Sequence, residues 1–195
     1  MDAETFARED RKYSELWKDG YREANWKRLA RAVLGSCTPN KNGQRTSLID
    51  LGFGRGAALD FFEEKGFRVA GVDISSYAVL VQRPKKREVY QASLDDMRFL
   101  TDGCFDIGFA NDTLEHIPEE LIRASLAEAA RICSEYLFVS VCPMPSHHLS
   151  LEGENLHLTV KPRKWWEEQL AALGRIERVP FLLSRSLRYA VELSK

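Results

Sequence analysis

The sequence predicts an α/β fold with a doubly wound, mostly parallel sheet of seven strands, preceded by a helical extension. From residue 47 onward, short apolar runs alternate with helical patterns, which is typical of a parallel sheet covered by helices. The last two β-rich segments, 175–183 and 187–193, are separated by only three residues. A connection that short cannot cross over a sheet, so these two strands are expected to form an antiparallel hairpin at the sheet edge.

The first 35 residues are expected to form the helical extension. Between Phe6 and Leu34 the apolar residues recur at helical spacing, and this pattern is broken near Gly20 and closed by Gly35. Two helices are therefore predicted there. We expect the chain to divide into a helical extension or lid at residues 1–35 and a main domain at residues 36–195.

The first elements of the main domain follow from its apolar runs and its helix signals. After a loop at 38–45, a strand is predicted at 47–51, a helix at 56–65 and a second strand at 68–72. Ser75 is expected to cap the next helix and Pro84 to end it. Serine can accept a hydrogen bond from a free N–H at a helix start, and proline cannot continue a helix.

The remaining elements precede the hairpin. Strands are predicted at 88–92, 105–110 and 136–141. A helix at 118–132 has proline at its first turn and apolar residues at helical spacing. A last helix is predicted at 162–173, closed by Gly174.

Composition limits the kind of protein. The chain has 195 residues and a formal net charge of −1, which argues against a general binder of nucleic acids or membrane surfaces. Its longest strongly apolar run, 136–142, is far shorter than the ~20 residues of a membrane helix, and its acidic start does not resemble a signal peptide. We therefore expect a soluble, cytoplasmic protein with no membrane span that binds no nucleic acid.

Three glycines at alternate positions, Gly52, Gly54 and Gly56, join the first strand to the next helix. Glycines at such a turn let a ligand approach the backbone closely, and the start of the helix offers free N–H groups. The pattern also fits a dinucleotide-binding fingerprint. Asp73 ends the second strand, where an acidic residue would bind the ribose hydroxyls of any adenosine cofactor.

Two features distinguish between the possible cofactors. Asp50 stands two residues before the first glycine, where its carboxylate would repel a pyrophosphate but would suit a ligand with an ammonium group. The chain also has no room for a separate catalytic domain after the first half of the sheet. Both features disfavour a nicotinamide-dependent oxidoreductase, an alternative that predicts binding of NAD.

Over residues 46–195 the sequence resembles the class I (Rossmann-like) S-adenosylmethionine-dependent methyltransferases. The resemblance rests on the glycine motif at 48–56, the segment 71–75 at the end of the second strand, Phe105 with Asp106, and the segment 111–117. It implies a Rossmann-like sheet and S-adenosylmethionine as the cofactor.

The resemblance also implies the residues that bind the methionine part and the ribose. The backbone at Gly52, Gly54 and Gly56 would contact the methionine part of the cofactor, and Asp50 would lie near its amino group. Asp73 would accept hydrogen bonds from both ribose hydroxyls.

Four further residues are implied at the adenine and the sulfonium. Ile74 would pack on the adenine, and Ser93 and Leu94 would lie beside the adenine amine and ring. Ser93 departs from the acidic residue that the family usually has at this position. Asn111 would lie by the sulfonium and the acceptor.

The segment 143–157 is the natural lid, and it holds three of the four histidines. His147, His148 and His157 are candidates for a general base that removes a proton from an acceptor hydroxyl. His116 is a fourth candidate, with a structural or cofactor-adjacent role for Glu115 and His116 as the alternative. The spacing of histidines and acidic residues in the lid matches no standard ligand motif, so we predict no metal site.

Tyr13, Trp17 and Tyr21 follow one another at four-residue spacing, on one face of a continuous helix. They could pack the extension onto the sheet or form aromatic walls around an acceptor. Together these features predict an enzyme that methylates a small-molecule or glycan acceptor, with O-methylation of a sugar as the first hypothesis. The alternatives are N-methylation of a small metabolite and a non-catalytic S-adenosylmethionine-binding subunit of a larger assembly.

Overall fold

A computed structural model describes residues 1–21, 25–150, 152–180 and 186–194. Its main sheet has seven strands in the order β5-β4-β3-β6-β7-β9-β8. The strands are β3 (Ser47–Leu51), β4 (Arg68–Asp73), β5 (Glu88–Gln91), β6 (Phe105–Asn111), β7 (Cys133–Val141), β8 (Gly174–Arg178) and β9 (Leu187–Leu193). The pairs among β3 to β7 are parallel, and β9 pairs antiparallel with both β7 and β8. The predicted fold class is confirmed.

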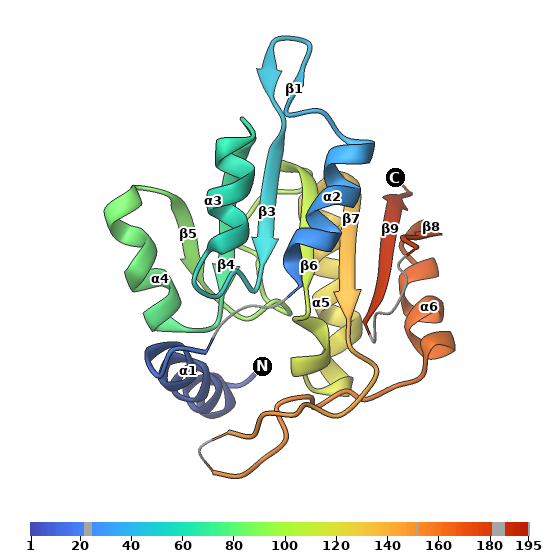
Figure 1. Cartoon of the computed structure of the whole chain (residues 1–195). Helices are drawn as coiled ribbons and strands as arrows, with labels where there is room; N and C mark the ends of the chain where they lie inside the picture. The colour runs from blue at the N-terminus through green and yellow to red at the C-terminus, as the bar shows by residue number, and fades with distance from the viewer. Residues whose placement is uncertain (22–24, 151, 181–185, 195) are drawn as a thin grey trace.

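Helices cover both faces of this sheet (Figure 1). They are α1 (Ala3–Lys18), α2 (Trp26–Ser36), α3 (Ala57–Glu64), α4 (Ser76–Gln82), α5 (Glu119–Ile132) and α6 (Arg163–Ala171). Short 3-10 turns follow α4 at Arg83–Lys85 and precede α5 at Leu114–His116. Within the described ranges, no helix is both long and apolar enough to span a membrane.

The two faces of the sheet bury separate cores because side chains alternate along each strand. On β7, Leu137 and Val139 point into a core completed by α5 and α6, whereas Phe138 points into a core completed by α2 and α3. The central strand β3 is buried along its whole length, as expected of a parallel strand covered on both faces. This burial fixes where the carboxyl ends of the strands lie.

The extension packs against the rest of the chain in two ways. Leu29 and Val33 of α2 are fully buried in the same core as Phe138. Helix α1 lies across the carboxyl ends of the strands, near the irregular segment that follows β7 (Figure 1). The Ser14 hydroxyl is 2.8 Å from that of Ser75, which joins α1 to the start of α4. The division at residue 35 stays a prediction.

The structure corrects several predicted boundaries. The expected loop at 38–45 contains a small antiparallel hairpin of β1 (Asn40–Lys41) and β2 (Gln44–Arg45). Gly35 lies inside α2, and the helix α6 ends at Ala171, so that Gly174 begins β8 instead of closing the helix.

The terminal hairpin is also shorter than predicted. Strand β8 ends at Arg178, because Pro180 has no N–H with which to continue the pairing. The predicted strand end at 181–183 and most of the predicted three-residue connection lie outside the described residues. The antiparallel pairing itself, from Gly174 opposite Leu193 to Arg178 opposite Tyr189, is as predicted.

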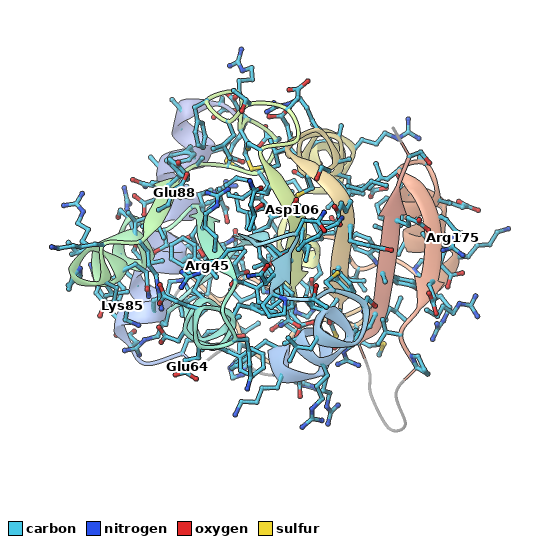
Figure 2. All side chains as sticks on the ribbon, turned by 90° about the horizontal axis from the view of Figure 1, so that it is seen from above. Arg45, Glu64, Lys85, Glu88, Asp106 and Arg175 are labelled. Atoms are coloured by element: carbon cyan, nitrogen blue, oxygen red, sulfur yellow. The ribbon has the colours of Figure 1, made fainter. Side chains whose placement is uncertain are left out.

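The amino ends of the strands are held by polar contacts of their own. Figure 2 looks onto this end, with Asp106 at the start of β6 near the centre of the view. Its carboxylate accepts hydrogen bonds from the backbone N–H and the hydroxyl of Ser47, at 2.7 and 2.6 Å. Because these bonds join β3 to β6, the acidic residue at this position stabilises the sheet at the edge opposite the cavity described next.

Candidate active site

A cavity of about 610 Å³ lies at the carboxyl ends of the parallel strands. Its floor is formed by residues at or just after the strand ends: Gly52, Asp73, Asn111 and Cys142. Its walls come from α1 and from the segment after β7. Ligands of open α/β sheets bind at this edge, next to the point where the strand order reverses. Here that point lies between β3 and β6, which are neighbours in space and far apart in sequence.

The glycine turn shapes the floor of the cavity. Gly52 has φ +86°, and a β-carbon there would lie 2.4 Å from Cγ2 of Thr113. Only glycine adopts this backbone readily and leaves room for Thr113. Gly52 lines the cavity, whereas Gly54 and Gly56 are not among its described lining residues. Gly56 instead is the N-cap of α3 and lies against the side chain of Gln82.

Asp73 is buried beneath the cavity. Its two carboxylate oxygens accept hydrogen bonds from the backbone N–H groups of Gly54 and Ser75, each at 2.8 Å. Burial raises the pKa of this carboxyl to about 6, although the two N–H groups act in the opposite direction. An ionised carboxylate has further lone pairs, so Asp73 can still accept hydrogen bonds from a ligand hydroxyl.

Four of the other residues predicted around the cofactor line the cavity: Ile74, Ser93, Leu94 and Asn111. Asp50 is buried within β3, where it lies opposite Gly71 of β4 and Phe109 of β6. It is not among the described lining residues. The structure therefore brings most of the predicted set together and leaves Asp50 inside the sheet.

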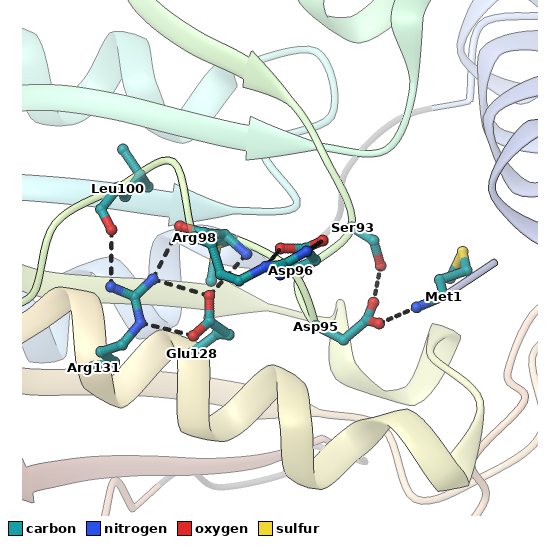
Figure 3. A network of polar contacts seen from close by, with 9 residues as sticks. Met1, Ser93, Asp95, Asp96, Arg98, Leu100, Glu128 and Arg131 are labelled. Carbon is teal, nitrogen blue, oxygen red and sulfur yellow. Dashed lines mark hydrogen bonds and ion pairs between the residues drawn. The ribbon is translucent and has the colours of Figure 1, made fainter. Parts of the chain in front are cut away.

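The wall that carries Ser93 is held in place by two groups of contacts, which Figure 3 shows. The Ser93 hydroxyl donates a hydrogen bond to Asp95, and Asp95 also pairs with the Met1 ammonium group. Farther along, the Arg131 guanidinium bonds Glu128 at 2.7 Å and the Leu100 carbonyl at 2.8 Å. The bond to Leu100 fastens the segment after β5 to α5.

All four predicted histidines line the same cavity. His147 and His148 are exposed, and the His148 ring lies edge-on to Tyr21 with centroids 5.3 Å apart. His116 and His157 are half-buried and lie edge-on to each other with centroids 4.9 Å apart. His116 and His157 are therefore the closer pair, although they are far apart in sequence.

Both rings of this pair have fixed orientations. Nδ1 of His157 lies 2.5 Å from the Met144 carbonyl, which can only accept, so Nδ1 carries a proton. Nδ1 of His116 is 3.1 Å from the Tyr13 hydroxyl. Burial, with smaller effects of His157 and Lys12, lowers the pKa of His116 to about 3. His116 is therefore neutral near pH 7.

Glu115 lies directly behind this histidine pair. One carboxylate oxygen accepts a hydrogen bond of 2.6 Å from the backbone N–H of Cys142. Its backbone carbonyl accepts from the N–H groups of Leu158 and Thr159, which ties the end of the lid to the site. The other carboxylate oxygen is buried and has no hydrogen-bond partner within the described residues. Burial, and then repulsion by Asp112, raises the pKa of Glu115.

Sequence reasoning did not find the contact between Tyr13 and His116. The four-residue spacing of Tyr13, Trp17 and Tyr21 left two roles open, and the structure supports both. Trp17 is buried in the core beneath α1. Tyr13 and Tyr21 reach histidines in the cavity wall. No local pattern predicts which histidine a tyrosine on a distant helix will meet.

Residues 49–136 match the family model described as a methyltransferase domain. That segment holds the glycine turn, Asp73, and Glu115 with His116. The segment 49–136 of this chain is therefore a methyltransferase domain of the kind that the family model describes. No curated protein matches the sequence.

Solved structures share the fold across nearly the whole chain. One is the 1,6-didemethyltoxoflavin-N1-methyltransferase of Burkholderia thailandensis with bound S-adenosylhomocysteine, at 17% identity, covering 98% of this chain and 87% of that one, with a TM-score of 0.68. Another is the magnesium protoporphyrin IX methyltransferase of Synechocystis with bound S-adenosylmethionine, at 16% identity, covering 100% of this chain and 98% of that one, with a TM-score of 0.66. A third, DhpI, is in complex with S-adenosylmethionine and HEP, at 15% identity, full coverage of both chains and a TM-score of 0.69. At identities this low, these similarities establish the fold alone.

The described residues fit S-adenosylmethionine as the cofactor. A buried carboxylate at Asp73 suits the hydroxyls of a ribose, and Ile74 with Leu94 gives an apolar wall next to it. The cavity volume of about 610 Å³ lies in the range of small-molecule sites, so it leaves space for an acceptor.

Proposed function

We propose that this enzyme transfers the methyl group of S-adenosylmethionine to a hydroxyl of a small-molecule acceptor, with a sugar or glycan hydroxyl as the first candidate. The cofactor supplies a methyl group already activated by a sulfonium. The protein must therefore align the acceptor, exclude water and assist the loss of the hydroxyl proton.

We assign the cofactor to the part of the cavity between Asp73 and Asn111. Asp73 would accept hydrogen bonds from the ribose hydroxyls, Ile74 and Leu94 would contact the adenine, and the Gly52 backbone would face the methionine part. Gly54 and Gly56 would act by shaping the turn, since neither lines the cavity. Asp50 would act through charge from inside the sheet and not by contact.

The acceptor would then occupy the part of the cavity under α1 and the lid. The observation that supports a hydroxyl acceptor most strongly is the convergence of Glu115, His116 and His157, each of which offers one ligand atom within 4.8 Å of the others. Imidazoles beside a carboxylate can assist the loss of a hydroxyl proton. His147 and His148 are exposed at the mouth of the cavity, where they suit contacts to the outer part of an acceptor.

A neutral amine needs no proton removed before transfer, so an N-methyltransferase has less use for such a cluster. The two other hypotheses, N-methylation of a small metabolite and a non-catalytic cofactor-binding subunit, remain to be tested beside the first. N-methylation predicts turnover that loss of His157 leaves unchanged, and the non-catalytic subunit predicts no turnover.

The test is release of S-adenosylhomocysteine from purified protein with panels of sugars, nucleotide-linked sugars, phenols and amines. We expect turnover with a hydroxyl acceptor, and a fall of about 10²-fold or more in kcat for His157→Gln. His148→Gln, in the same lid, is the matched control and should change KM more than kcat. Turnover with amines only would refute O-methylation, and turnover with none of the acceptors would favour the non-catalytic subunit.

A further inference from the structure

We propose that Glu115, His116 and His157 form a binding site for a divalent transition-metal ion of the zinc class, at the acceptor end of the cavity. The sequence predicted no metal site, because the spacing of histidines and acidic residues in the lid matches no standard ligand motif. His157 belongs to that lid, whereas Glu115 and His116 do not. The fold brings them together. One ligand atom from each of the three residues lies within 4.8 Å of those from the other two.

The ligand set itself points to this class of ion. Two imidazoles and one carboxylate hold zinc in catalytic sites, with a further position left for water or substrate. Imidazole ligands favour zinc, iron, nickel and copper over magnesium and calcium, which prefer oxygen ligands. The separations of the ligand atoms, all within 4.8 Å, exceed those in a closed tetrahedral site by no more than roughly 1.5 Å, so side-chain movement would close the site around an ion.

The buried carboxylate gives independent support. The second carboxylate oxygen of Glu115 is inaccessible to solvent and has no hydrogen-bond partner within the described part of the chain. Buried carboxylate oxygens without a partner are costly, and a bound cation would satisfy this one. The first oxygen is already held by the Cys142 N–H, so the free oxygen has a defined position.

The histidines also have the supporting contacts that metal ligands usually show. A ligating histidine commonly donates its other ring N–H to a carbonyl or another polar group, which fixes the ring. Nδ1 of His157 contacts the Met144 carbonyl, and this leaves Nε2 for a metal ion. The His116 ring is held by the Tyr13 hydroxyl and by a hydrogen bond to the Leu156 carbonyl. On ion binding, whichever His116 nitrogen becomes the ligand would have to give up its present contact.

This inference deepens the proposed function, since its catalytic consequence rests on a hydroxyl acceptor. An ion here would lower the pKa of an acceptor hydroxyl. The O–H bond would break with its proton passing to water, and the oxygen would form its bond to the methyl carbon as the bond from sulfur to that carbon breaks. Ion binding itself needs neither acceptor nor cofactor, so it can be tested separately.

The experiment titrates the full chain, freed of metal with a chelator, with Co²⁺ as the spectroscopic probe and Zn²⁺ as the competitor. We expect one Co²⁺ per chain, visible d–d absorption typical of nitrogen and oxygen ligands, and displacement by one equivalent of Zn²⁺. His157→Gln should weaken Co²⁺ binding by about 10-fold to 100-fold. His148→Gln, a lid histidine outside the cluster, should leave it within about twofold of wild type.

Glu115→Gln should weaken binding similarly, but its buried position could disturb folding, so circular dichroism accompanies it and His157→Gln decides the outcome. The proposal is overturned if the wild type binds no Co²⁺, or if His157→Gln binds it as tightly as the wild type. It is also overturned if His148→Gln weakens binding as much as His157→Gln. Failure of methyl transfer to every hydroxyl with intact Co²⁺ binding would refute the proposed O-methylation and leave the metal site standing.

Discussion

Ionisation of Asp73 should control cofactor binding between pH 5 and pH 7. Its pKa is raised from 3.8 to about 6 because the carboxyl is buried. If only the ionised form of Asp73 binds the cofactor, its protonation multiplies the apparent Kd by 1 + 10^(pKa − pH). Affinity for S-adenosylmethionine should therefore be about tenfold weaker at pH 5 than at pH 7.

The same shift affects folding stability with a defined sign. A carboxyl whose pKa is higher in the folded state favours folding below the unfolded pKa, and this contribution is lost as pH rises through about 6. The loss amounts to about 3 kcal/mol at most. The cofactor-free protein should thus become less stable over the pH range in which the cofactor begins to bind tightly.

Calorimetric titration with S-adenosylmethionine at pH 5, 6 and 7 measures the effect. Asp73→Asn cannot ionise, so its weaker binding should not change over this range. Asp96→Asn is the matched control, because Arg98 lowers the pKa of that exposed carboxyl to about 2. Constant wild-type affinity from pH 7 to pH 5, or an unchanged pH slope in Asp73→Asn, would refute the role of Asp73.

Three substitutions test how the structure shapes the site. Gly52→Ala adds a β-carbon at positive φ and against Thr113, so it should lower the free energy of unfolding in urea by about 2–4 kcal/mol. Adding Thr113→Ala should restore only the part due to the clash, and strictly additive effects in the double mutant would contradict this explanation. Arg131→Leu removes the bonds to Glu128 and to two backbone carbonyls, so it should lower the free energy of unfolding by about 1–3 kcal/mol and weaken cofactor binding. Unchanged stability would show that these bonds do not fasten the segment after β5. Tyr13→Phe removes the hydroxyl that holds the ring of His116, so it should lower the free energy of unfolding by about 1 kcal/mol and lower kcat more than it changes KM. An unaltered kcat would argue against a role for that contact.

The sheet could be predicted from the sequence because its signals are local. The strand Ser47–Leu51 is a short apolar run between turn residues, and the structure has the same bounds. The helix Glu119–Ile132 follows proline and has a regular apolar face. Alternation of such segments specifies a parallel sheet, and the short final connection specifies the hairpin. The end of β8 was missed because Pro180 outweighed the β-rich composition around it.

The site could be predicted only in part. Glycines and acidic residues at strand ends mark the cofactor region, since parallel strands bring those ends together. The cluster of Glu115, His116 and His157 depends on how the lid folds back, and an irregular segment carries no periodic signal for that. Backbone bonds from Leu158 and Thr159 to the Glu115 carbonyl bring the end of the lid to the site. Such contacts are visible only in three dimensions.

Calorimetric titration of the wild type with S-adenosylmethionine, S-adenosylhomocysteine and NAD tests the cofactor site most directly, with Asp73→Ala and Gly54→Val as the site variants. We predict binding of the first two ligands at one per chain, no binding of NAD, and loss of binding in both variants. Binding of NAD, or no binding of either adenosyl ligand by the wild type, would contradict the assignment of the cavity.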